Sequence, residues 1–334
     1  MVFYGDVVLD VDLKSFIEFD SAISSIASII VHPNDHPYDS DLLDIDDKGV
    51  VINFYSKPHD DSKFYLNLVN AAVYIFSPNI FKYILHDEPT DFGKDTFPLL
   101  LKSGEIIRAY NTSEYIKDIG TGERLKKVSN DLISGKVERH SKKYKRPAIF
   151  LDRDGTLIKQ VDLLHRAEDL ELFPFSASAV KKINDSDFLC FLVTNQPVVA
   201  RNLCDIDMVN NIHKKLETLL GRYRAYLNDI NFCPHHPDKG YPEERPDFKI
   251  DCECRKPRTG MIEELVKKYN VDIASSWFIG DTTTDIQTGI NAGLKTILVM
   301  TGNGGKDGKF NVSPDFVFDN IEDAVDYILC GRGE

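Results

Sequence analysis

The chain has 334 residues, of which 42% are hydrophobic, and a formal net charge of −13 at pH 7. This length and apolar content allow two hydrophobic cores and suggest two domains. No run of about 18 apolar residues exists, which excludes a typical membrane-spanning helix, and the acidic balance argues against general binding of nucleic acid. We therefore expect a soluble, cytoplasmic protein in which any anion site is locally basic.

Several short motifs in the first 130 residues occur in the order found in one enzyme family. They are Val2-Phe3-Tyr4-Gly5-Asp6, Ser56-Lys57-Pro58, Asn70-Ala71-Ala72, Asp91-Phe92-Gly93-Lys94-Asp95 and Tyr115-Ile116-Lys117-Asp118-Ile119-Gly120-Thr121. Together they resemble segments of the sugar-1-phosphate nucleotidyltransferases, an α/β family. The resemblance implies that Asp6 and Asp118 are metal ligands and that Lys57 holds a sugar phosphate.

This first resemblance is incomplete in one important respect. The glycine-rich nucleotide-binding signature, which that family carries upstream of the Gly-Asp segment, is absent. Without it there is no backbone nest for a nucleoside triphosphate, and the remaining sheet would expose an unpaired edge. We expect a truncated, vestigial domain that does not transfer nucleotides by itself. A natural remnant, a late start site and a partner chain that supplies the missing half are alternatives that the sequence leaves open.

Residues 131–146 end in a basic run, Lys136–Arg146, directly before Pro147. We interpret this run as a solvated linker rather than a patch for nucleic acid or membrane. The predicted organisation is therefore a truncated nucleotidyltransferase-like domain over 1–130, a linker over 131–146 and a second domain over 147–334.

The second domain opens with two carboxylates two positions apart at the end of an apolar strand. Ala148–Leu151 predicts the strand, and Asp152-Arg153-Asp154-Gly155-Thr156 follows it. Open parallel sheets place their ligands at the carboxyl ends of their strands, and Gly155 lets the chain turn sharply. A solvated acidic turn is the alternative reading of so short a motif. The segment resembles the first motif, DxDGT, of the haloacid dehalogenase superfamily of phosphatases.

Three further motifs of this superfamily follow in the required order. The apolar run Phe188–Val193 leads into Thr194-Asn195-Gln196, and Cys254-Arg255-Lys256-Pro257 supplies a lysine. The strand predicted over Ser276–Gly280 ends in Asp281, with Asp285 four positions later. Each motif also has a purely structural explanation. Asp281, for example, could cap the helix that begins near Thr283. Their common order favours the superfamily.

The resemblance implies a role for each motif residue. Asp152 attacks phosphorus and forms an aspartyl-phosphate, and Asp154 exchanges protons with the leaving group and with water. Thr194 and Lys256 hold the transferring group. Magnesium is bound by Asp152, the backbone carbonyl of Asp154 and Asp281, with Asp285 as a further candidate. The remaining expected site residues bind substrate: Asn195, Gln196 and Arg255.

A helix with a buried face is predicted between the second and third motifs. Its apolar residues recur at helical spacing, which predicts core packing rather than a cofactor site: Val209, Ile212, Leu216, Leu219, Leu220, Tyr223 and Leu227.

Two short ligand pairs predict a structural zinc site with three thiolates and one imidazole. The pairs are Cys233/His235 and Cys252/Cys254. His235 is favoured over His236 because residues two apart in an extended turn point to one side. A disulfide is the alternative, but cysteines separated by one residue do not easily bridge each other.

A CxH…CxC loop that runs into Arg-Lys-Pro resembles the D-glycero-D-manno-heptose 1,7-bisphosphate 7-phosphatases and the related histidinol-phosphate phosphatases. The resemblance implies a capless, Rossmann-like α/β phosphatase of a sugar phosphate, with catalytic magnesium and structural zinc. Histidinol phosphate as the substrate and a non-catalytic interaction subunit are the alternatives. One departure from the heptose family is Pro197–Asn202, which replaces the usual Ser-Gly-Ile-Ala-Arg-Gly after the second motif.

Overall fold

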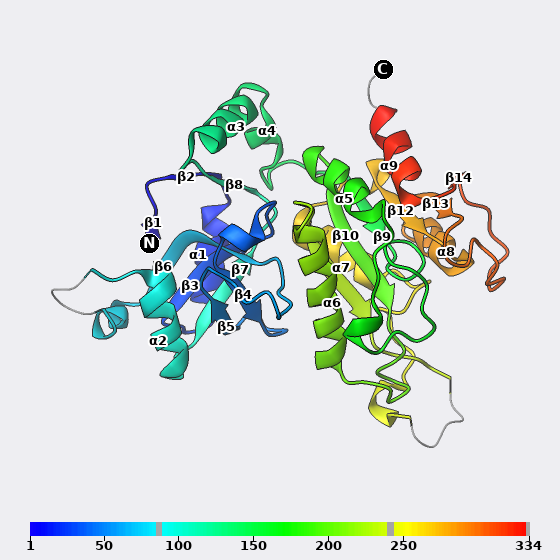
Figure 1. Ribbon diagram of the computed structural model, residues 1–334, viewed down its shortest axis with the longest axis horizontal. Coiled ribbons are helices and arrows are strands. Elements are labelled where there is room, and N and C mark those ends of the chain that lie inside the picture. Colours follow the sequence, from blue (N-terminus) through cyan, green and yellow to red (C-terminus); the bar gives the residue numbers. More distant parts are fainter. Residues whose placement is uncertain (85–88, 239–243, 332–334) are drawn as a thin grey trace. The chain divides into compact units, whose positions relative to one another are not determined.

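The computed structural model describes residues 1–84, 89–238 and 244–331. The chain divides into two compact units, Met1–Tyr144 and Lys145–Glu334, and each is considered by itself (Figure 1). Both are α/β, which confirms the predicted fold class. Among the described residues, none of the helices combines the length and the apolar character that crossing a membrane requires.

The first unit is built on a mixed sheet with the strand order β5-β4-β6-β3-β7, and β1 pairs with β6. β3 and β7 are parallel, and the other pairings are antiparallel. β2 and β8 form a separate two-stranded antiparallel ribbon. The strands are β1 (Val2–Phe3), β2 (Val7–Asp10), β3 (Ala27–His32), β4 (Leu42–Ile45), β5 (Val51–Tyr55), β6 (Val69–Phe76), β7 (Ile107–Asn111) and β8 (Tyr115–Asp118).

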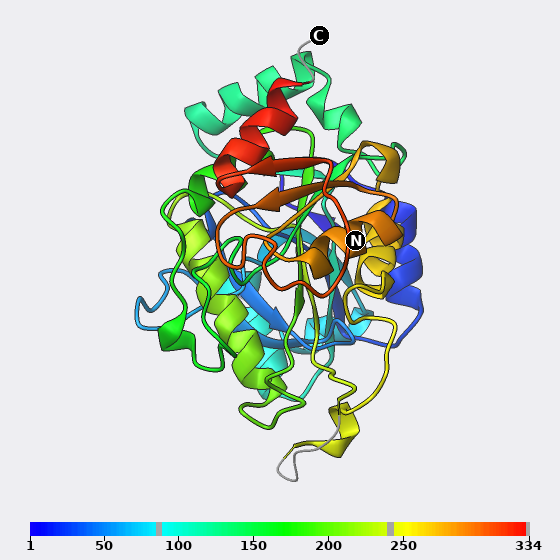
Figure 2. The same ribbon diagram turned by 90° about the vertical axis from the view of Figure 1, so that its right-hand side faces the viewer.

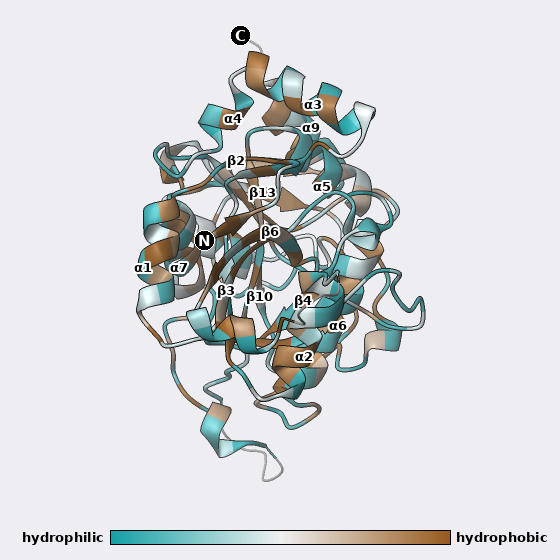
Figure 3. Cartoon of the chain, turned by 90° about the vertical axis from the view of Figure 1, so that its left-hand side faces the viewer, coloured by the Kyte–Doolittle hydropathy of each residue, from teal (hydrophilic) through white to brown (hydrophobic). Residues whose placement is uncertain are grey.

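Alternation along β3 explains why both faces of this sheet are covered. Ile29 packs in a core with Phe97, and Ile30, one position on, packs with Phe16 of α1 on the other face. Successive strand residues point to opposite faces, so two cores form on one sheet. In Figure 3, β3 and β6 are brown, whereas α1 carries both brown and teal. The helices are α1 (Leu13–Ser21), α2 (Phe97–Lys102), α3 (Gly122–Ile133) and α4 (Lys136–Arg139).

The segment expected as a linker is more ordered than the sequence indicated. Residues 131–146 include the end of α3 and all of α4, and the first unit extends to Tyr144. Arg146 is buried, and its Nε donates to the backbone oxygen of Asp187. The high charge of this run therefore does not keep it fully solvated, because its backbone forms helical turns and a long arginine side chain can pack its stem.

The second unit is an open sheet in which all strands are parallel, in the order β11-β10-β9-β12-β13-β14. Both faces of such a sheet are usually covered by helices. Figure 2 shows α6 and α9 on one side of the sheet and α7 and α8 on the other. The strands are β9 (Ala148–Leu151), β10 (Leu189–Asn195), β11 (Asp229–Cys233), β12 (Trp277–Gly280), β13 (Lys295–Val299) and β14 (Phe316–Phe318).

The helices of this unit largely follow the apolar patterns. They are α5 (Ser176–Asp185), α6 (Ile206–Gly221), α7 (Gly260–Tyr269), α8 (Thr283–Asn291) and α9 (Ile321–Cys330). Short helical turns in the two units are Pro37–Asp39, Pro78–Lys82, Phe92–Thr96, Ala167–Asp169, Pro246–Phe248 and Ile273–Ser275.

The helix predicted through Leu227 ends earlier than expected. α6 stops at Gly221, Arg224 has a φ of +60°, and Tyr223 is 66% exposed. A left-handed residue cannot continue a right-handed helix. Leu227 is still buried, because the chain turns back toward β11 rather than continuing the helix.

Candidate active site and metal centres

Three adjacent parallel strands end at the candidate active site. β9 ends at Leu151 directly before Asp152, β12 ends at Gly280 directly before Asp281, and Thr194 lies near the end of β10. β9 stands between β10 and β12 in the sheet. The carboxyl ends of these strands therefore bring together side chains that lie far apart in the sequence.

The centre of the site is a buried cluster of carboxylates. Oxygen atoms of Asp152, Asp281 and Asp285 lie within 4.8 Å of one another. Lys256 Nζ donates to Asp152 Oδ1 at 2.7 Å and to Asp285 Oδ1 at 2.6 Å. Three ionised carboxylates exceed the charge of one lysine, so the cluster favours a further cation.

The pKa values of the cluster reflect this excess of negative charge. Burial raises the pKa of Asp152 to about 7, with Asp285 acting in the same direction and Lys256 opposing it. Burial, Asp152 and Asp285 together raise the pKa of Asp281 to about 8. Burial lowers the pKa of Lys256, but the two carboxylates that it contacts raise it above its ordinary value. Without a further cation, protonation of Asp152 and Asp281 is therefore favoured over that of ordinary aspartates.

The oxygen atoms of this cluster fit a magnesium ion. Asp281 Oδ2 accepts from the backbone nitrogen of Asn303 at 2.6 Å, whereas Asp281 Oδ1 is buried and has no hydrogen-bond partner among the described residues. Magnesium prefers carboxylate oxygens and water, so this unpartnered oxygen and Asp152 are suitable ligands. Asp285 is more committed, because its Oδ2 also accepts from Thr282 in the cap of α8.

Asp154 is oriented by a network that the sequence analysis did not find. Arg153 is fully buried, and its Nη2 contacts Asp154 Oδ1 at 3.1 Å and Gln196 Oε1 at 2.7 Å. Gln196 Nε2 donates to Asp154 Oδ2 at 2.9 Å and to Thr194 Oγ1 at 3.0 Å. The only signal in the sequence was a charged residue inside an apolar-flanked motif. The contacts give Arg153 a positioning role.

The amide of Asn195 supports the backbone of Lys256. Its Nδ2 donates to the backbone oxygen of Lys256 at 3.1 Å, and its Oδ1 accepts from the backbone nitrogen of Lys256 at 3.0 Å. Asn195 and Gln196 also line the cavity of the site, so the substrate contacts expected of them stay predictions.

A cavity of about 220 Å³ opens over these groups. Five predicted site residues line it: Asp152, Asp154, Thr194, Arg255 and Lys256. Arg255 Nη1 donates to the backbone oxygen of His235 at 2.8 Å, which ties this arginine to the cysteine and histidine loop.

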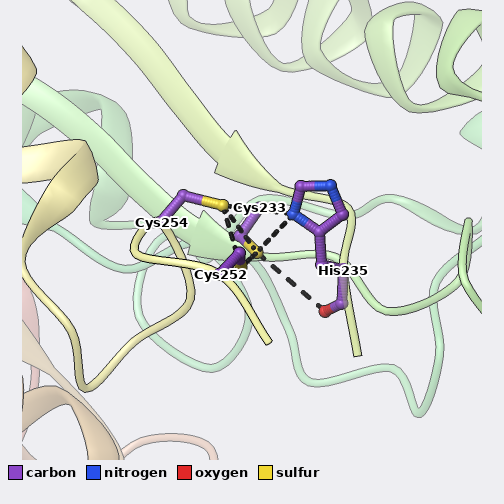
Figure 4. A group of neighbouring side chains, drawn as sticks. All are labelled: Cys233, His235, Cys252 and Cys254. Atoms are coloured by element: carbon purple, nitrogen blue, oxygen red, sulfur yellow. Dashed lines mark hydrogen bonds between the residues drawn. The ribbon is translucent and has the colours of Figure 1, made fainter. Parts of the chain in front are cut away.

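The four predicted zinc ligands lie together in one group (Figure 4). Sγ of Cys254 is 3.1 Å from Sγ of Cys233 and 3.2 Å from Sγ of Cys252, and His235 Nδ1 is 3.3 Å from Sγ of Cys254. These separations approach the edges of a tetrahedron around zinc, about 3.7 Å for Zn–S bonds of about 2.3 Å. The hydrogen bond between the Cys254 and Cys233 sulfur atoms, as the largest cause, lowers the pKa of Cys254 to about 5, which favours its thiolate form.

Neither alternative for this loop is supported by the geometry. The cysteines are free, and their sulfur atoms are well beyond the disulfide bond length of about 2.05 Å. His236 lies outside the group and its Nδ1 accepts from the backbone nitrogen of Asp238 at 3.2 Å.

The three site residues predicted in the first unit line one cavity of about 320 Å³: Asp6, Lys57 and Asp118. Asp118 is already paired, because Arg124 Nη1 contacts its Oδ1 at 2.7 Å and Arg124 Nη2 contacts Asp39 Oδ2 at 2.7 Å. Lys57 Nζ donates to the backbone oxygen of Asp39 at 2.9 Å. A metal at Asp118 would have to displace or share the guanidinium, so Asp118 in this arrangement fits a divalent cation poorly.

Comparisons with known proteins match the two units to two different families. Residues 1–135 match the family described as Nucleotidyl transferase, and residues 253–324 match the HAD-hydrolase-like family. The parallel sheet, the carboxylates at its strand ends and this match define the second unit as a phosphatase of the HAD-like class.

Two curated relatives make the assignment more specific. The chain is 38% identical over 190 residues to the D-glycero-D-manno-heptose-1,7-bisphosphate 7-phosphatase of Thermosynechococcus vestitus, covering 55% of this chain and 95% of the relative. It is 40% identical over 162 residues to the D-glycero-alpha-D-manno-heptose-1,7-bisphosphate 7-phosphatase of Photorhabdus laumondii, covering 46% and 82%. The chain belongs to the heptose-1,7-bisphosphate 7-phosphatase family, which confirms the family resemblance predicted from the sequence.

Two solved structures are also similar. The D,D-heptose 1,7-bisphosphate phosphatase from B. bronchiseptica, complexed with magnesium and phosphate, is 31% identical, and the alignment covers 55% of this chain and 99% of that chain with a TM-score of 0.49. HddC from Yersinia pseudotuberculosis is 28% identical over 39% of this chain and 53% of that chain, with a TM-score of 0.32.

Proposed function

We propose that this chain removes the 7-phosphate of D-glycero-D-manno-heptose 1,7-bisphosphate in a magnesium-dependent reaction. The observation that carries the proposal is the cluster of Asp152, Asp281 and Asp285 around Lys256, in a chain that belongs to the heptose bisphosphate phosphatase family. The relatives are named for both anomers of the sugar, so the proposal covers both.

The proposed reaction has two displacements at phosphorus. In the first, a carboxylate oxygen of Asp152 bonds to phosphorus as the bond to the sugar oxygen breaks, and Asp154 gives that oxygen its proton. In the second, Asp154 takes a proton from water, water bonds to phosphorus, and the bond to Asp152 breaks. The contacts of Arg153 and Gln196 hold Asp154 in one orientation for both transfers.

Charge neutralisation is the main task of the surrounding residues. Magnesium held by Asp152, Asp281 and the backbone carbonyl of Asp154 would offset the negative charge of the phosphoryl oxygens. Lys256, which contacts Asp152 and Asp285, neutralises part of the same negative charge. Thr194 offers a hydroxyl to the transferring group. The amide of Asn195 fixes the backbone that carries Lys256.

We also propose that Cys233, His235, Cys252 and Cys254 bind a structural zinc ion. Cys254 is followed directly by Arg255 and Lys256, so the metal would fix the start of the segment that carries both cations. Three free thiols in one group fit a reducing compartment, and a cytoplasmic location is part of the proposal.

For the first unit we propose that it does not transfer nucleotides in this chain. The support is the pairing of Asp118 with Arg124, which neutralises one of the two carboxylates predicted to hold a catalytic metal. The expected result is no release of pyrophosphate from GTP or another nucleoside triphosphate with heptose 1-phosphate. Formation of a nucleotide sugar by the 334-residue chain would contradict this part of the proposal.

The substrate proposal is tested by measuring phosphate release from three compounds with and without magnesium. We expect turnover of one or both anomers of D-glycero-D-manno-heptose 1,7-bisphosphate to exceed that of histidinol phosphate, and chelation by EDTA to stop it. A preference for histidinol phosphate would make that compound, and not the heptose bisphosphate, the assigned substrate. No turnover of any phosphate ester would indicate a non-catalytic subunit.

A further inference from the structure

The loop after β13 is fastened to the active site by several hydrogen bonds. Asp307 accepts from the backbone nitrogen of Thr283 at 2.7 Å and from its hydroxyl at 2.8 Å. The backbone nitrogen of Gly305 donates to the backbone oxygen of Asp281 at 2.8 Å, and that of Phe310 donates to the Thr283 hydroxyl at 3.1 Å. The loop is therefore held both at Asp281, which belongs to the buried carboxylate cluster, and at the start of α8.

Close packing of glycines reinforces this attachment. Gly302 has a φ of +57°, and a Cβ atom at this position would lie 2.6 Å from the Cα atom of Gly155 and 2.3 Å from Asp281 Oδ2. Only a residue without a side chain fits there. The loop thus approaches the motif that carries Asp152 and Asp154 and does not swing freely over the cavity.

This loop brings Lys309 to the cavity, where it is the least committed of three cations. Lys256 is bonded to two carboxylates, and Arg255 donates to the backbone oxygen of His235. Lys309 lines the same cavity, is exposed, and has no hydrogen bond or ion pair to any part of the chain that the structure describes. Its ammonium group is free to bind an anion.

We propose that Lys309 binds the phosphate that remains on the product, and so contributes to selecting a bisphosphate over a monophosphate. A bisphosphate places one phosphate at Asp152, and its second phosphate enters a cavity that is also lined by Asp154 and Asp162. These carboxylates repel a second dianion, so a cation is needed beyond the transfer site. Lysine suits this role as a mobile point charge that accepts either anomeric position.

This inference rests on the proposed function, and the test separates the two. The variant is Lys309→Met, and the matched control is Lys306→Met in the same loop, since Lys306 is exposed and does not line the cavity. Both are compared with the parent chain on heptose 1,7-bisphosphate and on heptose 7-phosphate, the same sugar without the second phosphate.

For Lys309→Met we expect KM for the bisphosphate to rise about tenfold, as for the loss of one charge-assisted hydrogen bond. We expect kcat for the bisphosphate and KM for the monophosphate to stay at the parent values, because the lysine acts only on the second phosphate. Lys306→Met should match the parent on both substrates.

The outcomes distinguish failure of this inference from failure of the proposed function. If the parent hydrolyses the bisphosphate but Lys309→Met leaves its KM unchanged, or raises KM equally for both substrates, the role of Lys309 is refuted alone. An equal effect of Lys306→Met would reduce the result to general electrostatics and also refute it. If the parent does not hydrolyse the bisphosphate, the proposed function fails and this inference fails with it.

Discussion

The carboxylates of the two units are neutralised in opposite ways. In the second unit, Asp152 and Asp285 share Lys256, and the third carboxylate of the cluster, Asp281, has its Oδ1 without a partner among the described residues. In the first unit, Arg124 bridges Asp118 and Asp39. Both units carry acidic motifs that resemble those of enzyme families, but of the predicted site carboxylates among the described residues only Asp281 keeps a buried oxygen without a partner. The comparison teaches that the electrostatic surroundings of a motif, more than its presence, indicate whether it can bind a catalytic metal.

The largest expected effect comes from removing the nucleophile. Asp152→Asn should lower phosphatase turnover by about 10⁴-fold or more, because the amide cannot attack phosphorus. The measurement is phosphate release at saturating substrate, with thermal unfolding to show that the variant is folded. The matched change in the other unit, Asp118→Asn, should leave turnover unchanged. Near-parent turnover by Asp152→Asn would remove the basis of the comparison.

Loss of proton transfer should be the next largest effect. Asp154→Asn is expected to lower kcat by about 10²- to 10⁴-fold. Asp162→Asn removes an exposed carboxylate that lines the same cavity, and we expect it to keep most activity. Equal losses in the two variants would indicate a general charge effect and would count against an acid/base role for Asp154.

Removal of a zinc ligand should act mainly on stability. Cys252→Ser should lower bound zinc below one ion per chain and lower Tm by about 10 °C, as expected for losing several kcal/mol in a domain of this size. The control is Cys330→Ser, since Cys330 is an exposed free thiol outside the group. Metal analysis that finds zinc unchanged in Cys252→Ser would contradict the assignment.

Magnesium should stabilise the second unit more at high pH than at low pH. The pKa values of Asp152 and Asp281 are raised from 3.8 to about 7 and about 8, so in the metal-free protein the stability linked to their protonation is complete below about pH 4 and is lost as the pH rises through these values. Magnesium replaces the protons. We therefore expect a larger increase in Tm on adding magnesium at pH 8 than at pH 5.5. An equal increase at both pH values would argue against binding at these carboxylates.

The smallest expected effect is that of removing the first unit. A fragment that begins at Lys145 should retain the phosphatase kcat and KM of the whole chain, because the two units have separate cores. Steady-state kinetics on the two proteins is the measurement. A large loss of activity in a folded fragment would show that the first unit contributes to the phosphatase reaction.

The active site could be predicted from the sequence to the extent that its residues follow apolar strands. Three of them lie at or near the carboxyl end of a parallel strand: Asp152, Thr194 and Asp281. For these residues the motif and the usual position of ligand sites in parallel sheets predict the same location. Arg153 was missed because nothing local shows that an arginine between two aspartates turns inward. Its role depends on Gln196, which is distant in sequence and becomes a neighbour only in the folded sheet.

The fold class could be predicted from the sequence, but the residues at which individual helices end could not. The apolar spacing that indicated α6 continued past the point where Arg224 adopts a left-handed conformation, and periodicity alone carries no information on backbone φ. The role of the loop around Lys309 was also hidden. Nothing in its sequence shows that Asp307 and the contact of Gly305 with the backbone of Asp281 fix it in place.

The order of the strands has a consequence for how the phosphatase unit becomes active during folding. β9, the first strand of this unit, is the third in the sheet, and it lies between β10 and β12, the latter about 125 residues later in the chain. A nascent chain therefore carries Asp152 early but lacks Asp281 until β12 inserts beside β9. Pairings between strands this distant in sequence are slow to form, so recovery of turnover would report the insertion of β12 beside β9 and provides a kinetic probe of refolding.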